Sequence, residues 1–362
     1  MTTPHDADTD SSAIRSVDTR LIRVPLSRPW AADVTDIRVI EVTITTDDGA
    51  HGHGFSWTPT IGGTAVKALL DDDLVPYVLG RPATPALWDG AWAHLHEAGG
   101  GGLTTVALAG IDLALWDLTA RRAETSVTEL LGRRHDRLRV YGSGVNLHYS
   151  LDDLVGQVRR WVESGHEAVK IKVGKPDLAE DLDRIAAVRD VLGAERRLLV
   201  DANQRWDLAT ATESVNAMAA YDIGWIEEPL RADDLAGHVE LRRRIDVPVA
   251  VGENLHTVYR FQDFLDAGAA DIVQPNIIRV GGITPFLRIA ELARSRGVEL
   301  APHLLPELSA QVAFALPEAS WIEDVEDAGF ADLGALTAPT GITVSGGWAF
   351  GGPEQGLGLR FR

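Results

Sequence analysis

RLLVDAN, at residues 197–203, is a run of apolar residues that stops at an acid and an amide. Short, nearly continuous apolar runs are typical of strands in a parallel sheet whose two faces are both covered. The same pattern, an apolar run followed by polar side chains, recurs in AVKIKV (168–173), GWIEEP (224–229), VPVAVGE (247–253), ADIVQP (270–275) and VELAPH (298–303). Amphipathic stretches of helical period separate these runs. The alternation predicts a succession of βα units.

Two further apolar runs, LRVYGSGV (138–145) and a weaker one in SWIED (320–324), bring the number of units to eight. Eight βα units favour a (β/α)8-type barrel in an α/β protein. An open, doubly wound sheet is the alternative. It is disfavoured because no GxGxxG follows the first strand.

The chain changes character near residue 137. Before it, residues 13–26 and 37–57 alternate apolar and polar side chains at period two, with a turn at Asp48-Gly49. Three helical stretches follow, at residues 64–79, 85–97 and 103–122, of which the last is apolar on nearly every face and is expected to be buried. Residues 1–137 are therefore predicted to form an α+β domain whose first dozen residues are disordered. Residues 138–330 form the barrel. The glycine-rich segment 331–362 is expected to pack back on the first domain.

Composition excludes several classes of protein. The chain of 362 residues is 45% hydrophobic and 24% charged, as in ordinary globular proteins, and its formal charge of −19 argues against binding to nucleic acids or anionic membranes. It has no run of 18 apolar residues and no apolar segment near the N-terminus, so we expect neither a membrane span nor a signal peptide. It has no cysteine, hence no disulfide and no thiolate ligand. A cytoplasmic location is expected.

Acids stand at the ends of three consecutive predicted strands: Asp201, Glu227 and Glu253, each 26 residues after the one before. Strand ends of a barrel meet at one mouth, where active sites lie. A single acid there has an ordinary explanation, since exposed strand ends are often polar. Three converging carboxylates repel one another unless a cation neutralises them, and oxygen ligands suit Mg²⁺. The sequence therefore predicts a magnesium site.

Lys170 and Lys172 lie on one face of the strand before these acids. They are either counter-ions or catalytic groups. Near a dication and a second ammonium, the pKa of a lysine falls, so that the amine becomes a general base at neutral pH. Lys172 is then placed to abstract a proton α to a carboxylate, giving an enediolate.

Across the mouth lie His303, five units beyond Lys172, and Glu323 in the last strand. A histidine at a strand end is often structural. Opposite a lysine base, it is placed to act as a second base or as the acid that protonates a leaving group. Glu323 either donates a hydrogen bond to the enediolate, if its pKa is raised, or orients neighbouring groups.

These residues together resemble the enolase superfamily, in its mandelate racemase/muconate-lactonising branch. The resemblance covers nearly the whole chain and rests on GIDLALWDL and ELLGRR before the barrel, then KxK, DAN, IEEP, GEN, a polar residue after QP, RVGGIT, the histidine and the late glutamate, in that order. It implies an N-terminal capping domain, completed by the C-terminal tail, over the barrel. It also implies homo-oligomers and specificity determined by the capping loops.

For individual residues, the resemblance implies Mg²⁺ bound by Asp201, Glu227 and Glu253. It implies Lys172 as the base on one face of the substrate, with Lys170 contacting the substrate carboxylate. His303 is the implied acid or base on the other face, and Glu323 the electrophilic partner.

Asn276 departs from the family pattern, which usually has an aspartate paired with the histidine there. It is either a turn residue that ends the strand or a residue that orients His303 by accepting a hydrogen bond from the ring. An amide stabilises an imidazolium less than a carboxylate does, so His303 is expected to be a weaker base. This favours a reaction that needs one base and one acid.

The predicted reaction is dehydration of an acid sugar to a 2-keto-3-deoxy acid. The alternatives are a cycloisomerase of a sugar-derived acid, a racemase or epimerase of a carboxylate, and a non-catalytic binding barrel. Residues expected to contact substrate are Asn203 in the barrel and Trp30, Trp57 and His53 in the capping domain. Each has an ordinary alternative: the tryptophans as domain core, and His53 with His51 as a solvated pair on one strand face.

Overall fold

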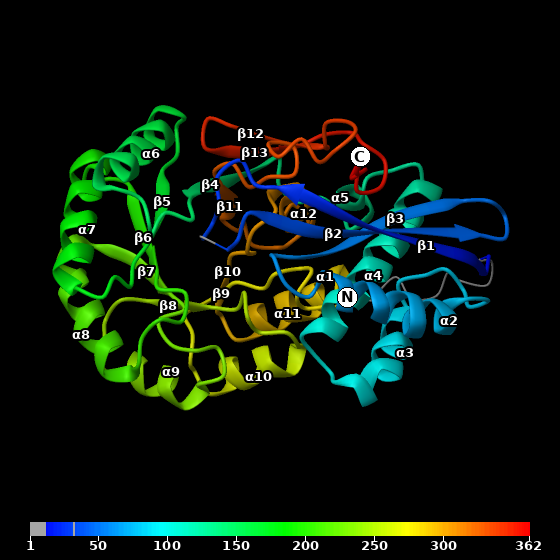
Figure 1. Ribbon diagram of the computed structural model, residues 1–362, viewed down its shortest axis with the longest axis horizontal. Coiled ribbons are helices and arrows are strands. Elements are labelled where there is room, and N and C mark those ends of the chain that lie inside the picture. Colours follow the sequence, from blue (N-terminus) through cyan, green and yellow to red (C-terminus); the bar gives the residue numbers. More distant parts are fainter. Residues whose placement is uncertain (1–11, 32) are drawn as a thin grey trace.

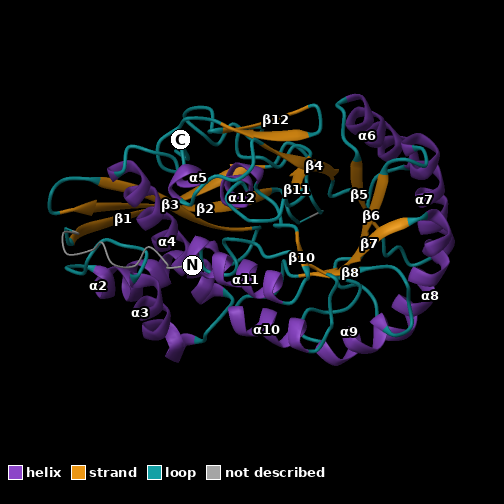
Figure 2. Ribbon diagram, turned by 180° about the vertical axis from the view of Figure 1, so that it is seen from behind, coloured by secondary structure: helices purple, strands orange, loops and turns teal. Residues whose placement is uncertain are grey.

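The computed structural model describes residues 12–31 and 33–362, so nearly all of the predicted N-terminal tail lies outside the described residues. The molecule has two lobes (Figure 1). One is a barrel of parallel strands with helices on its outside, and the other is a sheet with helices packed against it. Figure 2 shows the helices of the barrel as an outer layer around its strands.

The first lobe is the predicted α+β domain. Its sheet has the order β1-β2-β3, antiparallel throughout, and the turn at Asp48-Gly49 joins β2 to β3, where Gly49 takes a left-handed φ of 84°. The strands are β1 (Ile14–Pro25), β2 (Asp36–Thr46) and β3 (His51–Thr58). The helices are α1 (Gly63–Ala68), the π-helical turn η1 (Leu69–Leu74), α2 (Val75–Val78), α3 (Leu87–His94), the 3-10 turn η2 (Leu95–Ala98), α4 (Leu103–Arg122) and α5 (Val127–Leu130).

Helix α4 is the core helix of this lobe. It begins and ends at the residues predicted from the sequence, and it is apolar on nearly every face because it lies between the sheet and the barrel. By length and composition alone α4 is apolar enough to cross a membrane, but 83% of its apolar window is buried inside the protein. Its hydrophobicity therefore stabilises the folded domain.

The second lobe is a barrel of eight strands, β4 to β11. Neighbouring strands pair in parallel from β4 to β10, and β11 pairs with β4. The strands are β4 (Arg137–Ser143), β5 (Ala168–Lys172), β6 (Arg197–Asp201), β7 (Ile223–Glu227), β8 (Val249–Val251), β9 (Ile272–Val273), β10 (Glu299–Leu300) and β11 (Ile322–Val325). All eight predicted strands are present.

A helix follows each strand of the barrel except the last. These helices are α6 (Leu151–Glu163), α7 (Leu178–Leu192), α8 (Leu208–Met218), extended by the 3-10 turn η3 (Ala219–Tyr221), α9 (Leu235–Arg242), α10 (Val258–Asp266), α11 (Ile283–Ser295) and α12 (Pro306–Ala313). After β11 the chain forms a hairpin, β12 (Ile342–Ser345) and β13 (Trp348–Gly351), in place of an eighth helix. The barrel is thus of the (β/α)7β form.

The C-terminal segment contacts both lobes. Strand β13 pairs antiparallel with the first residues of β4, Arg137–Arg139, which extend beyond the barrel. Its last residues reach the capping domain, where Leu357 N donates to Asp117 at 2.7 Å and the Phe361 ring lies 5.2 Å from that of Phe55. The end of the tail therefore contacts the capping domain, while its hairpin extends the barrel sheet.

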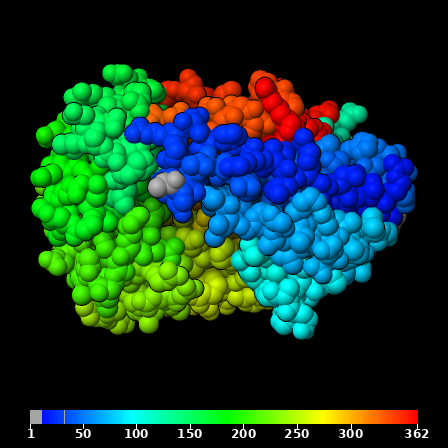
Figure 3. Space-filling model, viewed as in Figure 1, coloured from blue at the N-terminus to red at the C-terminus, as the bar shows by residue number. Residues whose placement is uncertain are grey.

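The loop between β1 and β2 reaches from the capping domain over the barrel (Figure 1). Its Arg28 guanidinium stacks 3.5 Å from the centre of the Tyr149 ring and lies 3.6 Å from Asp153 of α6. Figure 3 shows capping-domain atoms in direct contact with barrel atoms along this side. The barrel mouth consequently faces the capping domain.

A buried carboxylate joins the two lobes. Asp112 of α4 accepts hydrogen bonds from the backbone N–H (3.0 Å) and the hydroxyl (2.6 Å) of Thr284 in the first turn of α11. Helix α11 has Gly282 at its N-cap and therefore no capping side chain of its own, so Asp112 satisfies its free N–H groups from the other lobe. A Cβ at residue 282 would lie 2.2 Å from the Asp112 carboxylate, which explains the glycine.

Burial raises the pKa of Asp112 from 3.8 to about 7 against the opposing hydrogen bonds from Thr284. Between about pH 4 and pH 7 the unfolded chain therefore loses this proton while the folded protein retains it, and the free energy of unfolding falls as pH rises. Asp112→Asn removes the titration. We expect the stability of the wild type relative to this variant to decrease by up to a few kcal/mol between pH 4 and pH 7, at about 1.4 kcal/mol per pKa unit.

Urea unfolding of both proteins in EDTA, followed by tryptophan fluorescence at several pH values, measures this difference. A difference that stays constant from pH 4 to pH 8 would contradict the assignment of the proton to Asp112.

Candidate active site

The register of the barrel strands brings the predicted residues to one level. Lys172 pairs with Asp201, and Asp201 with Glu227, so the last residues of β5, β6 and β7 lie side by side. Glu253 lies two residues beyond the end of β8, and Gly252 directs the chain there with φ 148°. A Cβ at Gly252 would lie 2.6 Å from the backbone N of Gln274, so only glycine allows this approach.

Asp201, Glu227 and Glu253 form the predicted metal site. Each offers one oxygen, the three oxygens lie within 4.8 Å of one another, and all three side chains are buried. Hard oxygen ligands in a site that admits no thiolate fit Mg²⁺. The equal spacing along the sequence thus becomes convergence in space.

Lys170 lies among these acids and is fully buried. Its Nζ donates to both oxygens of Glu227 (2.9 and 2.7 Å) and lies 2.7 Å from Glu323. Burial alone would lower the pKa of Lys170, but Glu227 and Glu323 raise it well above its usual value. Lys170 is therefore a fixed positive charge.

The Lys172 ammonium donates to Asp201 at the mouth. Burial and the Lys170 ammonium lower the pKa of Lys172, but the Asp201 carboxylate outweighs both, and the net shift from the protein's own groups is upward. The predicted fall in this pKa depends on a bound dication, so it stays a prediction for the magnesium-loaded site.

Glu323 accepts hydrogen bonds from the Ser143 hydroxyl (2.7 Å) and from the backbone N–H of Leu304 (2.9 Å), besides its ion pair with Lys170. Burial would raise the pKa of Glu323, but Lys170 and His303 lower it to about 2. Of the two predicted roles, donation from a raised-pKa carboxyl is wrong. Glu323 is a carboxylate that holds Lys170 and the loop after His303.

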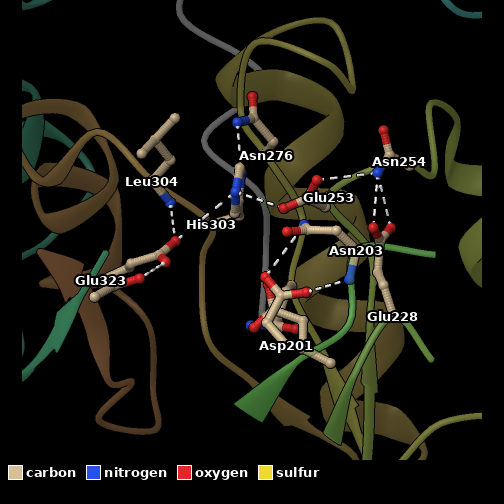
Figure 4. A network of polar contacts seen from close by, with 12 residues as sticks. Asp201, Asn203, Glu228, Glu253, Asn254, Asn276, His303, Leu304 and Glu323 are labelled. Atoms are coloured by element: carbon tan, nitrogen blue, oxygen red, sulfur yellow. Dashed lines mark hydrogen bonds and ion pairs between the residues drawn. The ribbon is translucent and has the colours of Figure 1, made fainter. Parts of the chain in front are cut away.

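His303 faces the metal ligands, because its Nε2 lies 2.7 Å from Glu253 (Figure 4). Its Nδ1 lies 2.9 Å from Nδ2 of Asn276. The Asn276 oxygen accepts the backbone N–H groups of Ile278 and Arg279, both at 3.0 Å, so the amide NH₂ must face the ring. Asn276 therefore donates to His303, whereas we predicted that it accepts.

This geometry fixes the tautomer of His303. Because Nδ1 accepts from Asn276, the ring hydrogen lies on Nε2, which points to the metal ligands. Asn276 makes contacts of both kinds considered for it, although the direction of its hydrogen bond to the ring is opposite to the predicted one. Its oxygen caps the turn after β9, and its nitrogen orients the histidine.

A layer of amide and guanidinium groups holds the ligands. Asn203 donates to Asp201 through its backbone N–H (2.8 Å) and its side chain (3.3 Å), and Gln274 donates to Glu227 (2.8 Å). Asn254 donates to Glu253 at 3.0 Å, and Arg279 lies 3.5 Å from the same carboxylate. Gln274 and Asn254 were not singled out from the sequence. Both residues lie at the ends of predicted strands, next to or near the acids, and this position could have identified them as groups that hold the ligands.

The substrate-contact candidates in the capping domain lie in different surroundings. Trp30 and Trp57 contact each other edge to face at 6.5 Å, and Nε1 of the buried Trp57 has no hydrogen-bond partner among the described residues. His53 pairs across the sheet with Thr43, whose hydroxyl lies 3.2 Å from its ring. The backbone N–H of His53 donates to Asp117 of α4 at 2.9 Å, so these two contacts lie within the capping domain, and a contact of His53 with substrate stays a prediction.

The metal site predicts a specific stabilisation. Mg²⁺ at about 100 times its Kd stabilises a folded protein by about 2.7 kcal/mol, so the Tm of the EDTA-treated wild type is expected to rise by several degrees. Glu253→Gln should abolish the rise, because one of three charged ligands is lost. Glu240→Gln, which removes an exposed acid of α9 paired with Arg244, should leave the rise unchanged. Equal shifts in all three proteins, measured by calorimetry, would contradict this site.

Comparison with known proteins gives the same picture. The model of the mandelate racemase/muconate lactonizing enzyme N-terminal domain matches residues 14–132, and that of the enolase C-terminal domain-like family matches residues 153–362. The chain is 37% identical over 316 residues to a 3,6-anhydro-alpha-L-galactonate cycloisomerase of Streptomyces coelicolor, covering 86% of this chain and 88% of that protein. It is 39% identical over 302 residues to an L-talarate/galactarate dehydratase of Salmonella typhimurium, covering 81% and 74%.

A solved structure that holds both a metal ion and a ligand is similar along nearly the whole chain. The L-talarate dehydratase of Polaromonas sp. JS666, complexed with Mg and L-glucarate, superposes with a TM-score of 0.86 at 37% identity and covers 97% of this chain and 96% of that one. Mg²⁺ is therefore the cofactor, with Asp201, Glu227 and Glu253 as its site. The chain belongs to the mandelate racemase/muconate lactonizing enzyme group of the enolase superfamily.

Proposed function

We propose that this enzyme removes the proton α to the carboxylate of an acid sugar and eliminates the β-hydroxyl, giving a 2-keto-3-deoxy acid. The single observation that carries the choice of reaction is the hydrogen bond from Asn276 to Nδ1 of His303. This hydrogen bond favours elimination over racemisation.

Racemisation needs a base on each face of the substrate. To be a base, the Nε2 of His303 must be free of hydrogen, which requires the hydrogen on Nδ1. That nitrogen instead faces the NH₂ of Asn276, whose oxygen is held by two backbone N–H groups. His303 thus presents an N–H donor, which assists the departure of a β-oxygen.

Lys172 is the proposed base. It lies at the end of β5, at the level of the metal ligands, where a bound dication would favour the neutral amine that takes the α-proton. Lys170, held between Glu227 and Glu323, stays charged and attracts the substrate carboxylate. Bound Mg²⁺ neutralises that carboxylate and makes the α-proton more acidic.

The elimination balances as follows. The Lys172 amine takes the α-proton, the electrons of the Cα–H bond form the Cα–Cβ double bond, and the Cβ–O bond breaks. The oxygen leaves as hydroxide, which accepts a hydrogen bond from Nε2 of His303 and is neutralised by the proton that the Lys172 ammonium then releases. The α-hydrogen and the β-hydroxyl leave the substrate as one water. The remaining enol tautomerises to the keto acid.

A cycloisomerase is the second candidate. In a 3,6-anhydro acid the β-oxygen belongs to an ether ring, so the same elimination opens the ring and yields an isomeric keto acid without loss of water. The similarity to the Streptomyces coelicolor cycloisomerase, which extends along most of both chains, favours this candidate. Asn203, Trp30 and Trp57 are the proposed substrate contacts. Homo-oligomer formation and a cytoplasmic location stay predictions.

A screen of acid sugars with Mg²⁺ distinguishes the two candidates. Keto-acid formation is detected with semicarbazide, and mass spectrometry then determines whether the product is lighter than the substrate by one water or equal to it. L-talarate, galactarate and 3,6-anhydro-L-galactonate are the first substrates to try. If no acid in the screen gives a keto acid or exchanges its α-hydrogen in D₂O, both proposals are wrong.

Two variants assign the roles. Lys172→Ala is expected to lower α-hydrogen exchange and turnover by at least about 100-fold, as for loss of a general base. His303→Asn keeps the base, so exchange persists while keto-acid formation falls. NMR in D₂O measures exchange and elimination together. Loss of exchange in His303→Asn with retention in Lys172→Ala would reverse the assignment.

Asn276→Asp tests the tautomer. A carboxylate at residue 276 still accepts the N–H groups of Ile278 and Arg279, but it also accepts Nδ1–H and so frees Nε2 to act as a base. We expect elimination to fall about tenfold, the equivalent of one hydrogen bond, while epimerisation of recovered substrate appears. Chiral analysis of that substrate measures it. If neither rate changes, Asn276 is only a turn residue.

A further inference from the structure

Glu228 is a buried acid beside the metal site that does not belong to it. It follows the ligand Glu227 directly and is 1% exposed, yet the cluster of metal-ligating oxygens contains only Asp201, Glu227 and Glu253. A fourth buried carboxylate here adds to the repulsion among the other three. The presence of this buried acid therefore needs a physical explanation.

The backbone at Glu228 is held in an unusual conformation. Its φ is 40°, in the left-handed region that side-chain-bearing residues seldom adopt. Two neighbours hold it there: Glu228 N donates to the Ala250 carbonyl at 2.9 Å, and Gln204 N donates to the Glu228 carbonyl at 2.7 Å. These bonds connect Glu228 to β8 on one side and to the loop after β6 on the other.

Among the residues that the structure describes, the donors to the Glu228 carboxylate are amide side chains. Asn254 Nδ2 donates to both of its oxygens, at 2.9 and 2.8 Å (Figure 4). Gln204 Nε2 donates to Oε2 at 3.1 Å. The orientation of Gln204 is fixed, because its oxygen accepts the backbone N–H of Ala232 at 2.8 Å. Both partners therefore present donors to Glu228.

Each partner leads to a metal ligand. Asn254 also donates to Oε1 of Glu253, while its own oxygen accepts from Arg279 at 2.5 Å. Gln204 follows Asn203, whose two N–H groups donate to Asp201. Asn203 and Gln204 both have left-handed φ angles, 43° and 63°, so this turn depends on the contacts that hold it.

We propose that Glu228 is a positioning residue of the magnesium centre. Its carboxylate connects the loops after β6 and β8, and through Gln204 and Asn254 it holds Asp201 and Glu253 with their oxygens toward the cation. Groups that orient metal ligands in this way typically contribute 10–100-fold to metal affinity. The inference rests on the metal site alone and holds for either proposed reaction.

Glu228→Gln tests it with little change of shape. The variant replaces an accepting oxygen by an NH₂ that faces the donors of Asn254 and Gln204. We expect the Kd for Mg²⁺, measured by calorimetric titration of EDTA-treated protein, to rise 10–100-fold. The matched control is Asp233→Asn, a nearby acid whose side chain is 87% exposed, for which the Kd should change less than about twofold.

Gln204→Glu distinguishes a positioning role of Glu228 from a purely electrostatic one, because the two explanations predict opposite changes in the affinity for Mg²⁺. If Glu228 acted only through its negative charge, an added carboxylate at residue 204 would tighten Mg²⁺ binding. If it positions the ligands, two carboxylates face each other without a donor, and binding weakens at least about fivefold. The double variant Glu228→Gln/Gln204→Glu exchanges donor and acceptor and should recover most of the affinity.

Circular dichroism and the Tm in EDTA report whether each variant folds. A Kd for Glu228→Gln within about twofold of the wild type would overturn the proposal, as would tighter binding by Gln204→Glu. If Glu228→Gln does not fold, the direction in which Gln204→Glu changes the Kd for Mg²⁺ tests the proposal by itself.

Discussion

Three carboxylates whose oxygens converge within 4.8 Å, at a site shielded from water, are the constraint on which this barrel mouth depends. In a low-dielectric environment their mutual repulsion is large, and only opposite charge or hydrogen-bond donors offset it. Mg²⁺ supplies part of that charge, and Lys170 and Lys172 supply more from the neighbouring strand. The two lysines of KxK are thus both the counter-charge of the metal site and the proposed catalytic pair.

Every ligand is held by a group from another strand. Glu227 is held by Lys170 of β5 and by Gln274, which follows β9, and Glu323 of β11 in turn holds Lys170. The geometry of the site therefore depends on closure of the barrel, because β11 reaches β5 only through its pairing with β4. The capping domain adds a further condition, since Asp112 caps a barrel helix.

Asn276 shows how one neutral side chain changes the chemistry available to the site. An amide can satisfy two backbone N–H groups with its oxygen and still donate with its nitrogen, whereas a carboxylate in the same place only accepts. The histidine beside it then carries its hydrogen on the nitrogen that faces the substrate side. In the proposed reaction, elimination is favoured over racemisation by the direction of this hydrogen bond, without any change in the metal ligands.

The sequence by itself determined the barrel, the helix Leu103–Arg122 and the three metal ligands, because these depend on local period and on a strand spacing that repeats along the chain. It also indicated Lys170, Lys172 and His303, which follow the same strand-end rule. Only the tertiary structure decided the ionised state of Glu323, the direction of the Asn276 hydrogen bond and the pairing of His53 with Thr43 in the capping-domain sheet. Each of these depends on contacts between residues far apart in the chain, and neither composition nor spacing records which donor faces which acceptor.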